Sequence, residues 1–361
     1  MKVPFRFRIN HFVTAFAGLL AFHYANADPV SVFATGFNNP RGLKFGPDGN
    51  LYVAEGGFGG QDSTDGQCDQ VPGAGPYTGS PVGSRISRVD RHGFRTTVVD
   101  NLPSSQTGPN AGNQISGVAD IAFIKDKLYA LIAGAGCSHG VPGIPNGVIR
   151  VNPDTSWDMI ADLSAFYKSH PVANPFSGDF EPDGVPYSMI TFQGDLYVLE
   201  PNHGELDKIT TSGSISRIVD ISASRGHIVP TAVTAHDGSF FVGNLNTFPI
   251  VRGSSKILQI SKNGNIHVAV DGLTTVLGVV FDQQDRIYVL QNTTGKGNQF
   301  PTPGTGNIVR ITANGGKQII ASGLFLPTAM TFGPDGALYV SNIGFGPPPD
   351  GLGQILKVDV R

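Results

Sequence analysis

The chain has 361 residues and a formal net charge of −3, which excludes the strongly basic surface that nucleic-acid-binding proteins use. Only 15% of the residues are charged, whereas 48 glycines and 26 prolines favour many short strands joined by turns. The composition therefore predicts an all-β protein without a nucleic-acid partner.

The first 27 residues have the features of a secretory signal peptide. Three basic residues within the first eight precede the apolar run FVTAFAGLLAF, and the segment ends in the small-residue pattern ANA. We expect cleavage after Ala27, so that the mature chain starts at Asp28 and is secreted or periplasmic. An uncleaved N-terminal anchor is the alternative. No later segment is apolar for long enough to cross a membrane as a helix.

The rest of the chain repeats one pattern six times. An apolar strand is followed by a turn, often of the Asp-Gly type, then by a second strand with an aromatic residue and by a third strand. A fourth strand closes most units. The aligned aromatic residues are Tyr52, Tyr129, Tyr197, Phe241, Tyr288 and Tyr339. Six units of four strands predict a six-bladed β-propeller that forms a single domain over residues 28–361.

The two ends of the chain supply parts of the same unit. The sixth unit ends after its third strand, whereas VSVFATGFNNP at residues 30–40 resembles KQIIASGLFLP, the segment that precedes the sixth unit. We expect residues 30–37 to complete the last blade, which closes the ring and removes open sheet edges. The alternative is an open solenoid, which would carry polar capping units at its ends.

The first two units carry long insertions between their second and third strands. These loops occupy corresponding places in adjacent blades and contain Cys68 and Cys137. Because an exported protein meets an oxidising compartment, we expect the two cysteines to form a disulfide, and metal binding by the thiols is the weaker alternative. After the second unit, ADLSAFYKSH has helical spacing and predicts a short helix that caps the channel or packs against a neighbouring loop.

These motifs resemble a known family. The phrase DGNLYVAEGG followed by SRISRV resembles an NHL repeat, whose consensus has an acidic or amide residue three positions after the aromatic. The signal peptide, NNPRGLKFGPDGNLYVAEGG, IADLSAFYKSH, FEPDGVPYSM and YVLEPNHGELDKITTSG together resemble the ScyD/ScyE family of exported bacterial propellers. The resemblance covers nearly the whole mature chain and implies an NHL-like propeller, but it implies no particular substrate.

Oxygen-bearing side chains recur at the position three after each aligned aromatic. They are Glu55, Glu200, Asn244, Gln291 and Asn342, with Ile132 as the exception in the second unit. Carboxylate and amide oxygens suit Ca²⁺, so Glu55, Glu200, Asn244 and Asn342 are candidate metal ligands. The alternative is that each side chain binds backbone N–H groups and fixes the turn after its strand.

Charged residues at the starts of the first strands are candidates for ligand binding. Arg41 is the one cation among the six equivalent positions, and Asp120 lies one residue further along in the second unit. An arginine there could hold a carboxylate, and a salt bridge from Arg41 to Asp120 or Glu55 is the alternative.

The acidic segment GDFEPDG, residues 178–184, precedes another group of polar residues. Its alternating oxygens resemble the start of an EF-hand loop, but Ile190 stands where the bidentate glutamate should be. We therefore interpret the segment as a solvated surface loop. Glu200, Asn202 and His203 in the following loop are candidate ligand-binding residues, and His203 and His227 are the candidates for a general base.

The sequence assigns no catalytic residue, because it contains neither G-x-S-x-G nor H-E-x-x-H. It favours a binding scaffold whose unidentified ligand, a small molecule or a protein, lies at the loop-rich face of the channel. A Ca²⁺-dependent, lactonase-like hydrolase or accessory enzyme stays open, although the first strand lacks the glutamate that six-bladed lactonases use. A protein-interaction module also stays open if Phe58, Phe345 and Pro347 to Pro349 form an exposed patch.

Overall fold

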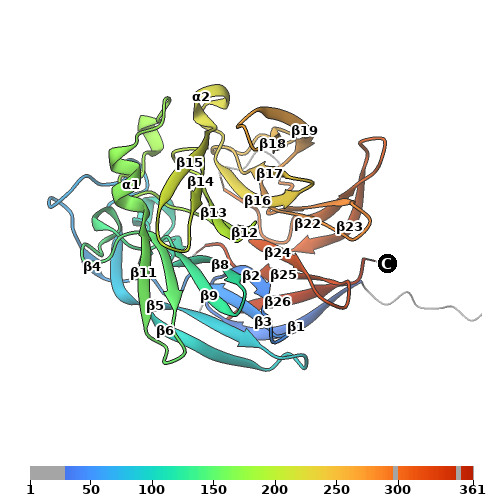
Figure 1. Cartoon of the computed structure of the whole chain (residues 1–361), viewed down its shortest axis with the longest axis horizontal. Helices are drawn as coiled ribbons and strands as arrows, with labels where there is room; N and C mark the ends of the chain where they lie inside the picture. Colours follow the sequence, from blue (N-terminus) through green and yellow to red (C-terminus); the bar gives the residue numbers. More distant parts are fainter. Residues whose placement is uncertain (1–28, 296–299, 347–350, 361) are drawn as a thin grey trace, which may run out of the picture.

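The computed structural model describes residues 29–295, 300–346 and 351–360. Within these residues the strands form six antiparallel sheets around one axis, each built on four strands, so the predicted six-bladed propeller is confirmed (Figure 1). The predicted signal peptide lies outside the described residues. The described residues include no helix that is both long enough and apolar enough to cross a bilayer.

The blades follow the chain, and the strands of each blade succeed one another from the channel outward. Blade 1 is β2 (Pro40–Phe45), β3 (Leu51–Glu55), β5 (Thr78–Val89) and β6 (Arg95–Gln106), with β4 (Asp62–Ser63) and β7 (Ile115–Ser116) added. Blade 2 is β8 (Val118–Ile124), β9 (Lys127–Ile132), β10 (Gly147–Val151) and β11 (Trp157–Asp162). Blade 3 is β12 (Ser188–Phe192), β13 (Asp195–Glu200), β14 (Glu205–Ile209) and β15 (Ile215–Asp220).

The remaining blades are more regular. Blade 4 is β16 (Pro230–His236), β17 (Ser239–Asn244), β18 (Ser255–Ile260) and β19 (Ile266–Leu273). Blade 5 is β20 (Val276–Phe281), β21 (Ile287–Gln291), β22 (Gly306–Ile311) and β23 (Lys317–Leu324). Blade 6 is β24 (Ala329–Phe332), β25 (Leu338–Asn342), β26 (Gly353–Val358) and β1 (Val30–Phe37).

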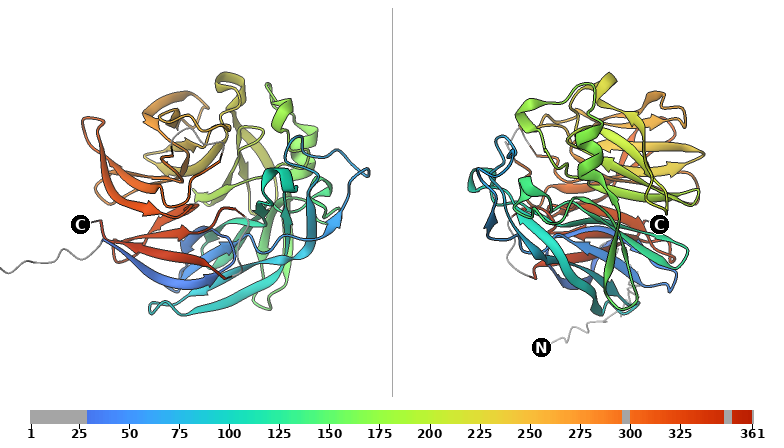
Figure 2. Two further views of the ribbon diagram at one scale, coloured as in Figure 1. Left: turned by 180° about the vertical axis from the view of Figure 1, so that it is seen from behind. Right: turned by 60° about the vertical axis from the view of Figure 1, so that its left-hand side comes forward.

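Strand β1 closes the ring as its sequence predicts. It pairs antiparallel with β26 from Val30 opposite Val358 to Phe37 opposite Gly353. Both views show the blue N-terminal strand beside the red C-terminal strands (Figures 1 and 2). Because the Phe37 side chain is fully buried, the strand contributes apolar packing as well as ladder hydrogen bonds.

Aromatic pairs between blades explain why the repeated phrase keeps its aromatic residues. An aromatic residue at or next to the end of an inner strand packs edge-on against the aligned aromatic of the preceding blade, with ring centroids about 5 Å apart. The pairs are Phe45–Tyr339, Phe123–Tyr52, Phe281–Phe241 and Phe332–Tyr288. These contacts lie at the face that carries the turns between first and second strands, which we call the turn face.

Hydrogen bonds link the inner strands at the opposite, loop-rich face. At five of the six blade junctions a side chain of one blade reaches a backbone carbonyl in the next blade or in the segment that leads into it. The donors and acceptors are Arg41 to Ile115 O, Ser188 to Thr231 O, Thr231 to Val276 O, Asn292 to Pro327 O and Thr328 to Pro40 O. At the blade 2–3 junction the Asp120 carboxylate accepts from the Met189 N–H at 2.8 Å. The ring therefore places Arg41 and Asp120 at the channel.

Short helices lie in the connections at the loop-rich face. They are η1 (Pro109–Ala111), η2 (Cys137–His139), α1 (Leu163–Ser169), η3 (Ser177–Asp179) and α2 (Ser222–Arg225). The predicted helix corresponds to α1, whose N-cap residue Asp162 accepts a hydrogen bond from the Ala165 N–H. Leu163 and Tyr167 belong to the core between blades 2 and 3, so α1 packs against its neighbours.

Candidate functional site

Arg41 and Tyr187 lie together at the loop-rich end of the channel. Arg41 is only 7% exposed, and its guanidinium donates a hydrogen bond to the Ile115 carbonyl. The Tyr187 hydroxyl lies beside this guanidinium, and it also donates to the Thr328 carbonyl at 3.4 Å. Because Tyr187 comes from blade 3 and Thr328 from blade 6, the tyrosine crosses the channel between opposite blades.

Neither predicted salt bridge of Arg41 forms. Glu55 instead pairs with Arg85, whose Nε lies 2.8 Å from the carboxylate. Asp120 lies 3.7 Å from Lys44 Nζ and accepts from the backbone N–H groups of Ile121 and Met189. Among the described residues Arg41 forms no ion pair with any carboxylate. A buried guanidinium without a counter-charge is uncommon, because burying an unpaired charge costs free energy.

The candidate metal ligands are engaged with the backbone of their own blades. The carboxylate or amide oxygen accepts an N–H from the segment that leads into the inner strand in four blades: Glu55 from Asn38, Glu200 from Val185, Gln291 from Thr274 and Asn342 from Phe325. Asn244 accepts from the Lys256 N–H instead. The four predicted ligands come from four different blades, and the described residues contain no cluster of three His, Cys, Asp or Glu side chains arranged for a metal ion. The calcium site stays a prediction.

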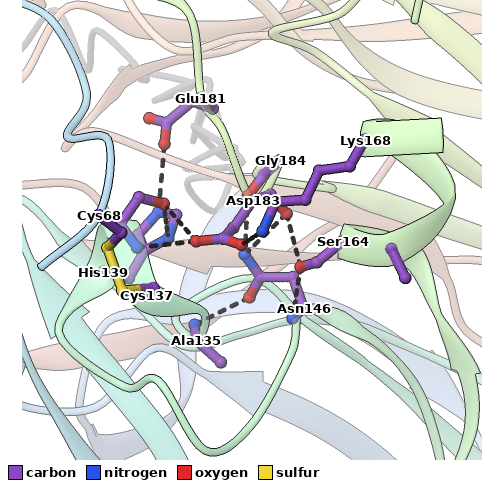
Figure 3. A network of polar contacts seen from close by, with 12 residues as sticks. Cys68, Ala135, Cys137, His139, Asn146, Ser164, Lys168, Glu181, Asp183 and Gly184 are labelled. Atoms are coloured by element: carbon purple, nitrogen blue, oxygen red, sulfur yellow. Dashed lines mark hydrogen bonds and ion pairs between the residues drawn. A yellow bond between two sulfur atoms is a disulfide. The ribbon is translucent and has the colours of Figure 1, made fainter. Parts of the chain in front are cut away.

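The predicted disulfide is confirmed and ties two insertions together. Cys68 and Cys137 are bonded, with their Cα atoms 6.3 Å apart (Figure 3). The residue after Cys137, Ser138, donates from its N–H at 2.7 Å and from its hydroxyl at 2.8 Å to the carboxylate of Asp183. The disulfide therefore holds η2 against the acidic segment between blades 2 and 3.

The interpretation of residues 178–184 as a solvated loop is wrong for Glu181 and Asp183, whereas the Asp179 side chain stays 46% exposed. Glu181 and Asp183 are 4% and 3% exposed, because the blade 1 insertion and α1 cover them. Tyr77 donates to Glu181 at 2.9 Å. Lys168 Nζ reaches Asp183 at 2.5 Å (Figure 3). Burial alone would raise the pKa of Asp183, but the bonds from Lys168 and Ser138 lower it overall. The segment is thus a buried structural link.

Glu200, Asn202 and His203, the candidate ligand-binding residues, lie under this loop rather than at an open surface. The backbone N–H of His203 donates to Glu200, and Asn202 accepts from the Glu181 N–H at 2.6 Å. The His203 ring stacks on Phe180, with centroids 4.9 Å apart. His227, the second candidate base, lies 3.2 Å from Asp179 and stacks on Phe176.

The His203 side chain carries a buried positive charge. Burial alone would lower its pKa, but the negative charge of Glu200, together with Glu205 and the Glu181 carbonyl, raises it to about 9. Glu205 also pairs with Arg217. Asp207 lies nearby with both carboxylate oxygens unpartnered, and burial raises its pKa well above the ordinary value. His203 is therefore protonated at neutral pH.

We predict that His203 makes stability fall as the pH rises. Because its folded-state pKa of about 9 lies above its ordinary value of 6.5, the charged ring stabilises the fold fully below pH 6.5, and this contribution is lost as the pH rises through about 9. The difference corresponds to about 3 kcal/mol. In urea unfolding across this range, His203→Gln should show a much flatter decline than the wild type. The exposed His267→Gln variant should decline as the wild type does, and an unchanged His203→Gln profile would contradict the assignment.

Some residues at the channel carry no signal in the sequence. Lys44, Thr234 and Thr331 line the channel toward the turn face. They lie on inner strands whose pattern predicts only apolar packing, so their exposure to the channel follows from ring closure. Tyr187 precedes a strand and reads as an ordinary aromatic residue. The one hint in the sequence is that Tyr187 directly precedes Ser188, which in blade 3 takes the position that Arg41 takes in blade 1.

Comparison with known proteins supports the fold and leaves the activity open. No protein-family model and no curated protein matches the chain. Among solved structures, a gluconolactonase from Xanthomonas campestris is 10% identical (TM-score 0.53), with 91% of this chain and 89% of that chain covered. A putative oxidoreductase (glucose dehydrogenase) from Thermus thermophilus is 16% identical (TM-score 0.56), covering 91% and 99%.

A third similar structure is a protein of unknown function from Bacteroides thetaiotaomicron. It is 11% identical, with a TM-score of 0.56 and coverage of 91% of this chain and 75% of that one. Identities this low establish a shared propeller fold, which hosts many unrelated functions. The resemblance to the ScyD/ScyE family stays a prediction.

Proposed function

We propose that this protein is an exported binding scaffold that holds a small carboxylate-bearing molecule at the loop-rich mouth of its channel. The observation that carries the proposal is the buried Arg41 guanidinium, which has no carboxylate partner among the described residues. Thr328 forms an equivalent inter-blade bond with a neutral hydroxyl. The bond between neighbouring blades therefore does not require a positive charge. We infer that the charge of Arg41 serves to bind an anion.

The geometry around Arg41 suits a carboxylate. A guanidinium has five N–H donors in a planar fork, and a single carbonyl bond occupies only part of it. A carboxylate can accept two parallel bonds from such a fork, and the adjacent Tyr187 hydroxyl supplies a further polar contact. We expect the ligand to approach from the loop-rich face, since Tyr187 crosses the channel at this level.

The test is ligand binding by Arg41→Gln. Glutamine can still donate to the Ile115 carbonyl but lacks the charge and the fork. Thermal-shift and calorimetric screening of small carboxylates against their methyl esters should identify carboxylates that bind the wild type. Arg41→Gln should weaken them about 10- to 100-fold, the range expected for a charge-assisted bond. Arg88→Gln, which removes an exposed arginine of the same blade, should bind as the wild type does. The proposal would be overturned if Arg41→Gln bound the carboxylate with the same affinity as Arg88→Gln.

Export is the second part of the proposal. A disulfide is the expected feature of a protein that folds in an oxidising compartment. When the full chain is expressed in a bacterial host, mass spectrometry of the mature protein should give a chain that begins at Asp28. A mature chain that retains residues 1–27 in the membrane fraction would support the anchored alternative.

A protein-interaction module is the second candidate function, favoured by exposed apolar side chains on loops of the loop-rich face. Phe58, Phe176, Phe300, Phe325 and Leu352 are each 43–52% exposed. Phe345 is half-buried, and Pro347 to Pro349 lie outside the described residues. Native mass spectrometry of the wild type and Phe58→Ser would detect self-association or partner capture. For the hydrolase alternative, metal analysis and a Ca²⁺-dependent rise in melting temperature are the discriminating measurements.

A further inference from the structure

A cavity in the channel is lined by neither Arg41 nor Tyr187. It has a volume of about 440 Å³, is bounded by the inner strands of all six blades, and extends from Ser188 and Leu277 toward the turn face. This volume is within the range of small-molecule sites. Tyr187 crosses the channel at the loop-rich end and contacts Arg41, and because neither side chain lines the cavity, we treat the cavity and the Arg41 mouth as two sites.

Three polar groups that line this cavity have hydrogen-bonding capacity to spare: the Lys44 ammonium and the hydroxyls of Thr234 and Thr331, from blades 1, 4 and 6. The two hydroxyls have no hydrogen-bond partner among the described residues. Lys44 is paired with Asp120 at 3.7 Å, which engages only part of its three N–H donors. By contrast, Thr191 and Ser188, which also line the cavity, donate to backbone carbonyls. The unused donors therefore face the same space.

The charge of the cavity favours an uncharged ligand. Lys44 and Asp120 contribute one charge of each sign, so the cavity has no net charge. Five of the six turns around its mouth carry aspartate: Asp48, Asp126, Asp237, Asp282 with Asp285, and Asp335. Three of these aspartates pair with cations: Asp48 with Arg88, Asp282 with Arg286 and Asp335 with Lys357. The mouth therefore offers no excess of positive charge that would favour a phosphate or carboxylate over an uncharged ligand.

Hydroxyl groups complement these partners. A hydroxyl both donates and accepts, so one ligand can accept from Lys44, exchange bonds with Thr234 and Thr331, and donate to Asp120. Phe45, Phe123 and Ile190 supply apolar lining for the carbon skeleton of such a molecule. We propose that the channel cavity is a second binding site, which takes an uncharged polyhydroxylated molecule of monosaccharide size. This site is independent of the carboxylate site at Arg41.

Saturation-transfer NMR and calorimetry test this site. The probes are glucose, mannitol and myo-inositol, with gluconate and glucosamine as charged counterparts. At least one uncharged probe should bind with a dissociation constant in the millimolar range or tighter. The charged counterparts, measured in the Arg41→Gln variant so that the carboxylate site does not contribute, should bind more weakly. The double variant Thr234→Val/Thr331→Val keeps the side-chain shape but removes both hydroxyls, and it should weaken binding about tenfold.

Controls separate the two sites. One control is Thr97→Val, the same substitution at an exposed position. The other is Arg41→Gln, which removes the carboxylate site. Both variants should bind the uncharged probe as the wild type does. If the double variant does not fold, the single Thr331→Val variant carries the test, with a weakening of at least twofold. The proposal is overturned if no uncharged probe binds the folded protein, if the threonine variants bind like the wild type, or if Arg41→Gln abolishes binding.

Discussion

Deleting residues 30–37 should leave the protein insoluble or unfolded. The deletion removes β1, so the edge of β26 loses its ladder partner and becomes open to pairing between molecules. It also removes Phe37, which is fully buried, and Ala34, which is 4% exposed. A chain that begins at Asp28 is the control and should be soluble with a cooperative melting transition.

A single substitution separates loss of packing from loss of the strand. Phe37→Ala in the full mature chain should cost about 3–5 kcal/mol, the usual range for truncating a buried phenylalanine. Phe94 is 70% exposed, so Phe94→Ala should change stability by about 0.5 kcal/mol or less. Urea unfolding measures both. If the deletion variant melted like its control, the closed ring would be contradicted.

Removing the disulfide should be the second large effect. The bond closes a loop of 69 residues, for which the chain-entropy model gives about 4 kcal/mol. In a chain of this size that loss corresponds to a fall of roughly 6 °C in melting temperature. The variant Cys68→Ser/Cys137→Ser measures it without a reductant, and the wild type with a reductant should give the same shift.

Hydrogen exchange should locate this effect. The disulfide holds η2, which donates to Asp183 through Ser138, so the segments around residues 62–77 and 137–146 should lose protection first. Exchange in the regular blades 4 and 5 is the internal control and should stay unchanged. An unaltered melting temperature together with unaltered protection of these segments would contradict the structural role of the disulfide.

The repeats made the architecture predictable because short sequence segments within each unit are enough to identify its strands and the strand that closes the ring. Each blade repeats the same inner-strand and aromatic positions, and the segment at 30–37 matches the segment that precedes the last blade. Cys68 and Cys137 could be paired for the same reason, because corresponding loops of adjacent blades emerge on one face. The fold therefore follows from spacing, independently of any resemblance.

The environments of charged residues were harder to predict. The alternating acids of residues 178–184 look solvated, yet Tyr77 from an insertion about a hundred residues earlier covers Glu181. The sequence is equally compatible with a salt bridge from Arg41 to Glu55 or Asp120. In the structure, Glu55 pairs with Arg85 and Asp120 pairs with Lys44. Such outcomes depend on which loops meet in space, and periodicity carries no information about that.

The most direct measurement is a crystal structure with the tightest carboxylate from the screen bound. The proposed function predicts both carboxylate oxygens within hydrogen-bond distance of the Arg41 guanidinium, with the rest of the molecule directed toward the loop-rich face. A carboxylate bound elsewhere, with Arg41 contacting only protein groups, would contradict it.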